Sequence, residues 1–449
     1  MSLKAPPGPS PFGFIIMLPG LLLNPVVKLN AVCKKYGPVI KLGIAGNYSY
    51  IINDKEIIRQ ILKTDYIKFP RGRTLDEIKF LLGNGIFASE HELWSVRRRL
   101  LKPAFHSSIF HKLENVLKEE LQKTTLKFQE FASGGTPFEP EAEFQKMLFS
   151  ATIRNLFAGK ISADTEPVIQ ALNKILAYPG IPQHTFRVVK KQYLRISGMK
   201  DKSREEILEA GRVIDKFTAG ILDWAINNPE ECGTYLNILL NEFFEGRISR
   251  EDIITEMKNI IFAGYDTTAS ALTWLIYSVS VNPGIEEKVL SEIASTGVPD
   301  YQNVTRLEYS KMVIKETLRL YPPAWVFHRI STEDFEAGSY HIPANSWIFI
   351  SPFLMHRNPE YWDNPDDFYP ERFEKEENSE TTRFDYIPFG NGPHVCIGNS
   401  LANFQLIYSL AYLLPKFRIE FRNKKITGFT SGIGLKADKP LKAIIRERK

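Results

Sequence analysis

The chain has 449 residues, of which 43% are hydrophobic and 24% are charged, a balance that excludes a disordered protein and is ordinary for a globular one. The net charge of +5 is small for this length, and no dense Lys/Arg cluster with interleaved aromatic residues occurs, so we expect no nucleic-acid binding. Three cysteines, Cys33, Cys232 and Cys396, lie far apart without a Cys-x-x-Cys pair, which argues against a structural zinc site and fits a reducing cytoplasm.

The first apolar stretch, Phe12 to Val27, is interrupted by Pro19-Gly20 and by Asn24-Pro25. A membrane-spanning helix needs about 20 uninterrupted apolar residues, and a signal peptide needs a charged start and a small-residue cleavage site. We therefore expect no transmembrane anchor and a cytoplasmic protein. Peripheral membrane contact through this apolar patch is the alternative.

Further along, the residue pattern changes from strand-like to helical and back. Alternation from Val39 to Asp54, with Gly46-Asn47 inside it, predicts a β-hairpin. Apolar residues at three- and four-residue spacing then predict helices to about Leu290, interrupted by residues 177–200, which we expect to be a long connection. Short strands are predicted again at 331–351, and alternation near the C-terminus predicts further hairpins. The fold class is therefore mainly α with small β-sheets (α+β).

A long central helix is predicted from Ser249, which stands in capping-box spacing with Asp252, to a point before Pro283. It spans roughly 30 residues, or about 45 Å. From Ile260 onward nearly all its residues are apolar or small, so we expect it to run through the protein's interior.

This helix contains the unusual sequence "AGYDTT", Ala263 to Thr268. A glycine inside a helix costs about 1 kcal/mol relative to alanine, and a buried carboxylate is expensive unless it is paired. The adjacent hydroxyls of Thr267 and Thr268 can bond to carbonyls of the preceding turn. Two interpretations stay open from these residues alone, a proton-carrying pair formed by Asp266 and a hydroxyl, or a helix kink with a structurally paired aspartate.

Two other pairs are ambiguous in isolation. Glu316 and Arg319, three residues apart, resemble an ordinary helical salt bridge. Trp94 and Arg98, four residues apart, would project together from a helix as a clamp for a carboxylate or propionate, or would belong to an ordinary basic helix face.

The stretch "FGNGPHVCIGNS", Phe389 to Ser400, places Cys396 in a glycine-rich loop just before a predicted helix. One interpretation is a small buried thiol. The other is a metal ligand, because glycine lets the backbone approach a flat group closely and a helix N-terminus favours the thiolate. Axial ligation of haem iron suits that environment.

Taken together, these motifs resemble the cytochrome P450 family of haem-thiolate monooxygenases, over nearly the whole chain. The cysteine-loop pattern is met by Phe389, Gly392, His394, Cys396 and Gly398, with histidine where arginine is more usual. The family's remaining motifs are met by Glu316 with Arg319, by Arg372, by Asp266 with Thr267, and by Trp94 with Arg98.

The resemblance implies one P450 domain over 1–449, a triangular helical bundle with a long central helix. In this domain the β-rich portions span about 36–70 and 330–355, and the helical portion spans about 75–325. The haem-ligand loop is 389–398. The resemblance makes Cys396 the axial thiolate ligand of haem b. The haem contacts that it implies are Trp94, Arg98, Arg329, His394 and, less directly, His356 for the propionates, with Phe389, Gly392, Gly398 and Ala263 around the macrocycle. Asp266 and Thr267 become the catalytic acid–alcohol pair, whereas Glu316, Arg319 and Arg372 are structural.

The activity implied is insertion of one oxygen atom of O₂ into a C–H or C=C bond of a small lipophilic substrate, such as a fatty acid, terpenoid or steroid-like molecule. Electrons would come from a separate ferredoxin or flavodoxin with its reductase, for which Arg97, Arg99 and Lys102 are docking candidates. We expect a monomer, and a pocket narrowed by Trp325 and Phe327. The alternatives are a peroxide-driven peroxygenase or isomerase, which typically lacks the acid–alcohol pair, and a non-catalytic haem-binding protein.

Overall fold

The computed structural model describes residues 4–44, 46–72, 79–157, 165–177, 202–374, 383–431 and 434–448. These residues group into two compact units. The first takes Met1–Leu75, Lys315–Cys396 and Ile426–Lys439, and the second takes Asp76–Ile314, Ile397–Lys425 and Pro440–Lys449. A single domain over 1–449 stays a prediction. The expected connection at 177–200 lies, apart from Ala177, outside the described residues.

The first unit is built on a four-stranded sheet in the order β1-β2-β6-β3. β1 (Val39–Ile44) and β2 (Asn47–Ile52) pair antiparallel, which confirms the predicted hairpin. β2 runs parallel to β6 (Trp347–Ile350), and β6 runs antiparallel to β3 (Phe327–Ile330). The smaller elements of this unit are α3 (Lys55–Arg59), the π-helical turn η1 (Gln60–Thr64), the 3₁₀ helices η2 (Tyr66–Lys68) and η7 (Pro370–Phe373), α16 (Pro352–Met355), and the hairpins β4 (Phe335–Ala337)–β5 (Tyr340–Ile342) and β8 (Phe429–Ser431)–β9 (Leu435–Ala437).

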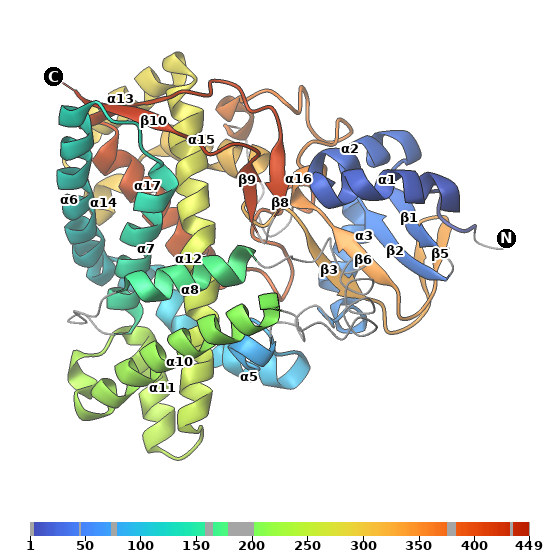
Figure 1. Ribbon diagram of the computed structural model, residues 1–449, viewed down its shortest axis with the longest axis horizontal. Coiled ribbons are helices and arrows are strands. Elements are labelled where there is room, and N and C mark those ends of the chain that lie inside the picture. The colour runs from blue at the N-terminus through green and yellow to red at the C-terminus, as the bar shows by residue number, and fades with distance from the viewer. Residues whose placement is uncertain are drawn as a thin grey trace. The chain divides into compact units, whose positions relative to one another are not determined.

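Two helices, α1 (Pro11–Leu23) and α2 (Pro25–Tyr36), precede this sheet in the chain. Figure 1 shows them beside β1. The break between them is local, because the Asn24 side chain accepts the Val27 N–H at 3.3 Å and Pro25 occupies the first helical position. No helix among the described residues is long and apolar enough to cross a membrane.

Within residues 36–70, the portion that we expect to be β-rich, the strands are those of the hairpin. The Asp54 carboxylate accepts the N–H groups of Glu56 and Ile57 at 2.9 and 3.0 Å, which starts α3 where the helical pattern is predicted to begin. Helical turns then continue to Lys68.

In its described residues the second unit is helical except for one pair of strands. Its helices are α5 (His91–Leu101), η3 (Lys102–Phe105), η4 (Ser107–Ile109), α6 (Phe110–Gly134), α7 (Pro140–Leu156), α8 (Glu166–Ala177), α10 (Lys202–Asn227), η6 (Pro229–Glu231), α11 (Thr234–Phe244), α12 (Arg250–Ser280), α13 (Pro283–Thr296), α14 (Tyr301–Val304) and α17 (Asn399–Leu413). α15 (Glu308–Leu320) begins in this unit and ends in the first.

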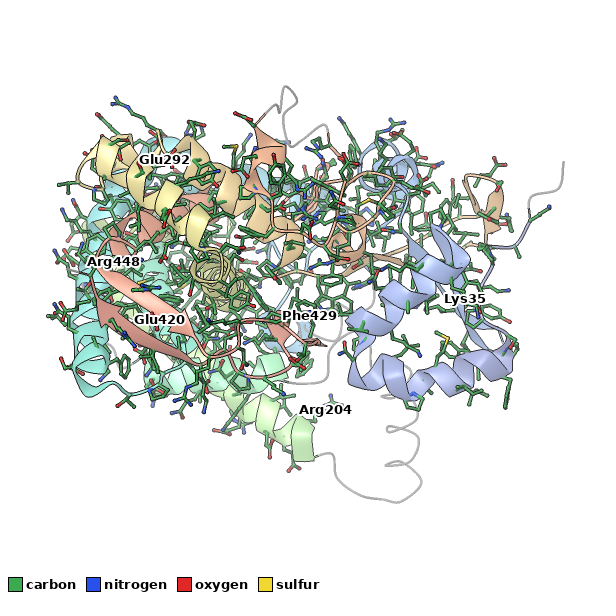
Figure 2. The ribbon with its side chains drawn as sticks, turned by 90° about the horizontal axis from the view of Figure 1, so that it is seen from above. Lys35, Arg204, Glu292, Glu420, Phe429 and Arg448 are labelled. Carbon is green, nitrogen blue, oxygen red and sulfur yellow. The ribbon has the colours of Figure 1, made fainter. Side chains whose placement is uncertain are left out.

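The strands of the second unit are β7 (Phe417–Phe421) and β10 (Ala443–Glu447), which pair antiparallel. They are far apart in the chain, so the alternating C-terminus forms one hairpin, β8–β9, and one distant pair. Arg448, labelled in Figure 2 near Glu420, secures the end of β10 by donating to Leu414 O at 2.8 Å and to Phe417 O at 3.2 Å.

The central helix α12 starts where the sequence predicts. The Ser249 hydroxyl accepts the Asp252 N–H at 3.1 Å, and the Asp252 carboxylate accepts the Ser249 N–H at 3.0 Å, which completes the capping box. Figure 1 shows α12 in yellow, and α7, α10 and α17 pack along it. The mainly α fold with small, separate sheets is confirmed.

Candidate functional site

Cys396 lies in the first unit, in a loop that ends shortly before α17. Its backbone N–H donates to Phe389 O at 2.9 Å, so the loop closes on itself, and its side chain is exposed. Gly392 has φ +72°, and a Cβ built on it would lie 1.9 Å from Leu62 O. Only glycine fits that position, because a side chain would meet both a strained backbone and a neighbouring carbonyl.

The other two cysteines are poor thiolates. Burial raises the pKa of the Cys33 thiol to about 12, and burial, together with the charges of Glu230 and Glu231, raises the pKa of Cys232 to about 11. Neither thiol is ionised at neutral pH. Cys396 is therefore the cysteine best placed to act as a ligand.

The cysteine loop fits an axial ligand to a flat metal complex. Among the described residues no group of three or more His, Cys, Asp or Glu side chains could hold a metal ion by itself. A haem would bring its own further iron ligands, and the exposed Cys396 thiol beside glycine backbone would hold its iron.

In the second unit, α12 carries an accessible face in an otherwise buried helix. Between Ile253 and Val279 every residue is buried except Ala263, Gly264 and Thr267, whose spacing places them on one side. A Cβ added to Gly264 would meet nothing closer than Thr152 Cγ2 at 3.8 Å, so this side has room. The Thr267 hydroxyl donates to Ala263 O at 2.9 Å, as predicted for a threonine in this sequence.

Asp266 is turned away from that face. Its side chain is 4% exposed, and its Oδ1 accepts a hydrogen bond from Gln145 Nε2 on α7 at 2.7 Å. Next to it, the buried Tyr265 hydroxyl donates to Asn173 Oδ1 on α8 at 3.1 Å, and burial raises the pKa of this tyrosine. Sequence reasoning missed Gln145, because nothing in the "EFQKMLFS" pattern separates it from other polar residues of an amphipathic helix.

The predicted propionate contacts divide between the units. In the second unit Trp94 is buried and Arg98 is half-buried, and the two residues lie four apart on α5. In the first unit Arg329 is buried on β3 and donates from Nη1 to His328 O at 2.8 Å. His394 is half-buried, with its ring edge-to-face against Tyr66 at 6.0 Å.

The charge cluster of the first unit is internal. Glu316 and Arg319 have no exposed surface, and they pair through Arg319 Nε–Glu316 Oε2 at 2.6 Å and Nη2–Oε1 at 2.9 Å. Arg372 Nε adds a bond to Glu316 Oε1 at 3.0 Å. Arg319 also donates to the main-chain oxygens of His356, Pro365 and Asp367. These bonds tie α15 to two later segments of the same unit.

His356 is committed to that internal network. Its Nδ1 lies 3.0 Å from Arg319 O and its Nε2 accepts the Ile387 N–H at 2.8 Å, so Nδ1 carries the proton. Burial holds the pKa of His356 well below its usual range. Both ring nitrogens are thus occupied by main chain, and His356 has no atom left for a propionate.

Trp325 also lies elsewhere than expected. It is 1% exposed and packs in the core of the first unit with Val26, Ile40 and Phe353. The sequence suggested that it narrows a substrate pocket, but its burial in this core contradicts that role.

Comparison with known proteins agrees with these motifs. The family model for cytochrome P450 matches residues 6–442. Cyclooctatin synthase of Streptomyces melanosporofaciens is 28% identical over 390 residues, which cover 86% of this chain and 83% of that protein. Carotene epsilon-monooxygenase of Arabidopsis thaliana is 26% identical, covering 93% of this chain and 80% of that protein, and cytochrome P450 3A2 of Rattus norvegicus is 26% identical, covering 92% and 85%.

Proposed function

Because the chain belongs to the cytochrome P450 family of haem-thiolate oxidoreductases, we propose that it inserts one oxygen atom of O₂ into a C–H or C=C bond of a lipophilic small molecule. The observation that carries this proposal is Cys396, whose exposed thiol stands in a glycine-constrained loop that resembles the family's cysteine-loop pattern. When bound, haem b supplies the activation of O₂.

We propose that the following residues contact the haem through their side chains or backbone. Cys396 holds the iron. Trp94, Arg98, Arg329 and His394 hold the propionates, and Phe389, Gly392, Gly398 and Ala263 contact the macrocycle. His356 is left out, because its ring nitrogens are already bonded to Arg319 O and the Ile387 N–H.

On α12, Thr267 and Asp266 are proposed to manage protons. The Thr267 hydroxyl lies on the accessible face and can exchange its bond to Ala263 O for one to a ligand there. Asp266 carries protons from solvent to that face when its bond to Gln145 opens. In this proposal the Asp266 carboxyl group donates the proton and the Thr267 hydroxyl relays it, so that no metal-bound base is needed.

The expected substrate is apolar. One relative is named for carotene, which is a hydrocarbon, and another for cyclooctatin, and both favour a terpenoid or similar lipophilic substrate over a charged one. The electron source is proposed to be a separate ferredoxin or flavodoxin with its reductase, acting on a cytoplasmic monomer.

For docking of that partner, Arg99 and Lys102 remain candidates and Arg97 does not. Arg99 and Lys102 are exposed, whereas the Arg97 side chain is 13% exposed and paired with Asp252 and Glu256.

Replacing Thr267 with alanine tests the proton-handling role. We expect the variant to consume reducing equivalents at a rate within a few-fold of wild type while product per electron pair falls about tenfold or more, because a positioned proton-transfer group speeds its step by roughly 10²–10⁴-fold. The measurement is the ratio of product to NAD(P)H consumed.

Thr273→Ala is the matched control for this test. Thr273 makes the same kind of bond, to Ala269 O at 2.8 Å, but is buried. Equal coupling in all three proteins would remove Thr267 from the mechanism. A wild-type protein that forms no product with NAD(P)H would instead favour a peroxide-driven or non-catalytic haem protein.

A further inference from the structure

The cysteine loop rests on helical turns that lie far earlier in the chain. Gly392 packs against the main chain of η1, because a Cβ added to it would lie 1.9 Å from Leu62 O and 3.4 Å from Lys63 Cα. Two residues further along, the His394 ring meets the Tyr66 ring of η2 edge-to-face at 6.0 Å. These contacts hold the middle of the loop against η1 and η2.

The Asn391 side chain ties Gly392 to another segment of the same unit. Asn391 is buried, and its Oδ1 accepts the Gly392 N–H at 2.6 Å. Its Nδ2 donates to Arg383 O at 2.8 Å. An amide group offers both an acceptor and a donor, so one side chain joins the two main-chain positions. We refer to these two bonds as the Asn391 bridge.

The far end of this bridge is a fixed point. Arg383 pairs with Asp385 through Nε–Oδ1 at 3.1 Å and Nη2–Oδ2 at 2.9 Å, and its guanidinium lies over the Trp362 ring at 4.9 Å. Trp362 is itself buried and donates from Nε1 to Asp385 O at 3.2 Å. The Arg319 guanidinium also lies over this ring, at 5.2 Å. A two-bond arginine–carboxylate pair and a cation–π contact both restrict geometry, so Arg383 O is a rigid acceptor.

From Gly392 the main chain carries this restraint to Cys396. Gly392 O accepts the Val395 N–H at 3.1 Å, and Phe389 O accepts the Cys396 N–H at 2.9 Å. Asn391 lies between Phe389 and Gly392 in the chain, that is, between the two acceptors that close the loop. A shift of either acceptor would therefore move the Cys396 side chain.

We propose that Asn391 is a positioning residue for the axial ligand. Its bridge to Arg383 O keeps Gly392 on Leu62 and thereby holds the Cys396 sulfur where it can bind haem iron. Asn391 is not among the residues that meet the cysteine-loop pattern, so the motif gives it no role. The inference deepens the proposed function of Cys396 and rests on it.

The carbon monoxide complex of the reduced, haem-loaded protein tests this role by its spectrum. Its red-shifted Soret band gives way to the band of histidine- or thiol-ligated haem when the cysteine leaves its position. We expect Asn391→Ala to speed this change about tenfold, the size expected from removing the hydrogen-bond partner of two main-chain groups. Rates are compared at a temperature at which circular dichroism shows both proteins to be folded.

Asn358→Ala is the matched control. Asn358 is also buried in the first unit, and it too bonds the main chain at both ends of its amide. Its Nδ2 donates to Asn53 O at 3.3 Å and its Oδ1 accepts the Glu360 N–H at 3.0 Å, but it lies outside the cysteine loop. This variant should stay within about twofold of the wild-type rate. Asn391→Leu, which removes both bonds at a similar side-chain volume, should match Asn391→Ala.

Hydrogen–deuterium exchange gives a second result that does not depend on the haem. Asn391→Ala should speed exchange of the Gly392 amide about tenfold or more, because its acceptor is gone. Asn358→Ala should leave that amide unchanged. Should Asn391→Ala fail to fold, Asn391→Ser is the milder variant, since one short hydroxyl cannot bridge the Gly392 N–H and Arg383 O, and the same criteria apply to it.

The outcomes separate this inference from the proposed function. A spectral change no faster in Asn391→Ala than in wild type, or equally fast in Asn358→Ala, would overturn the positioning role of Asn391. Unchanged exchange of the Gly392 amide would overturn the bridge itself. A wild-type protein that binds no haem, or whose carbon monoxide band lies at the histidine- or thiol-ligated position, would instead refute the proposed function, while the exchange result would still decide the bridge.

Discussion

At the scale of single residues, Glu316 is a buried carboxylate whose charge is balanced by two arginines. Its oxygens accept from Arg319, from Arg372 and from the Tyr369 N–H at 2.8 Å. Replacing it with alanine leaves the buried guanidinium group of Arg319 and the half-buried one of Arg372 with part of their bonding lost. We expect the free energy of unfolding to fall by about 3–5 kcal/mol, as for other buried pairs that lose one partner. Urea denaturation of the haem-loaded protein measures this.

Glu308→Ala provides a control on the same helix. Glu308 pairs with Lys311 at 2.6 Å, but its side chain is 75% exposed. An exposed pair contributes between 0 and about 1 kcal/mol, so this variant should stay close to wild type. A loss in Glu316→Ala no larger than in Glu308→Ala would show that the internal cluster does not stabilise the fold.

His356 gives a pH dependence of known sign. Burial lowers its pKa well below 6.5, so the folded protein keeps the ring neutral while the unfolded chain takes up a proton as the pH falls. The contribution of this histidine to the free energy of unfolding is therefore fully present above about pH 6.5. Below that pH it decreases by up to about 1.4 kcal/mol for each pH unit.

The measurement compares the free energy of unfolding at pH 7 and pH 5.5 in His356→Gln and in wild type. The loss on acidification should be about 1 kcal/mol smaller in the variant, because the proton uptake by the unfolded histidine is gone. His106→Gln, a replacement at an exposed position, controls for the loss of one histidine. Identical pH dependence in wild type and His356→Gln would mean that His356 ionises in the folded protein.

At the scale of elements, the cysteine loop depends on two glycines of different kinds. Gly390 and Gly392 both have positive φ, +70° and +72°. A Cβ on Gly390 would meet nothing within 4 Å, whereas one on Gly392 would lie 1.9 Å from Leu62 O. Gly390→Ala should therefore cost about 1 kcal/mol from backbone strain alone, and Gly392→Ala clearly more.

Because the loop carries Cys396, the Gly392→Ala change should also reduce haem content. Thermal unfolding and the haem-to-protein absorbance ratio measure the two effects. If both alanine variants retain full haem and equal stability, close contact with Leu62 does not shape the loop.

The central helix shows which element-scale features the sequence predicts. The capping box at Ser249 and Asp252 and the stop before Pro283 are local signals, and α12 spans Arg250–Ser280 accordingly. The change from strand to helix after Asp54 is also predicted, and the Asp54 carboxylate caps the first of the short helical turns there.

At the scale of the whole molecule, sequence reasoning finds residues that motifs carry and misses residues that only folding brings together. Cys396, Glu316 and Arg319 are recognised because several motifs along the chain agree with one family pattern. Gln145 and Asp266 are 121 residues apart, and Arg97 and Glu256 are 159 apart, so neither pair leaves a pattern in the sequence. Trp325 was misplaced for the same reason, because its core contacts come from distant helices and strands.

The central claim is that Cys396 supplies a thiolate to haem iron in an oxygen-activating enzyme. The most direct test is the absorbance spectrum of the purified protein reduced with dithionite and exposed to carbon monoxide, with Cys396→Ser measured alongside. We predict a strongly red-shifted Soret band in the wild type, typical of thiolate ligation, and its absence in the variant. A wild-type band at the position of histidine- or thiol-ligated haem, or no haem in protein made with ample haem, would contradict the claim.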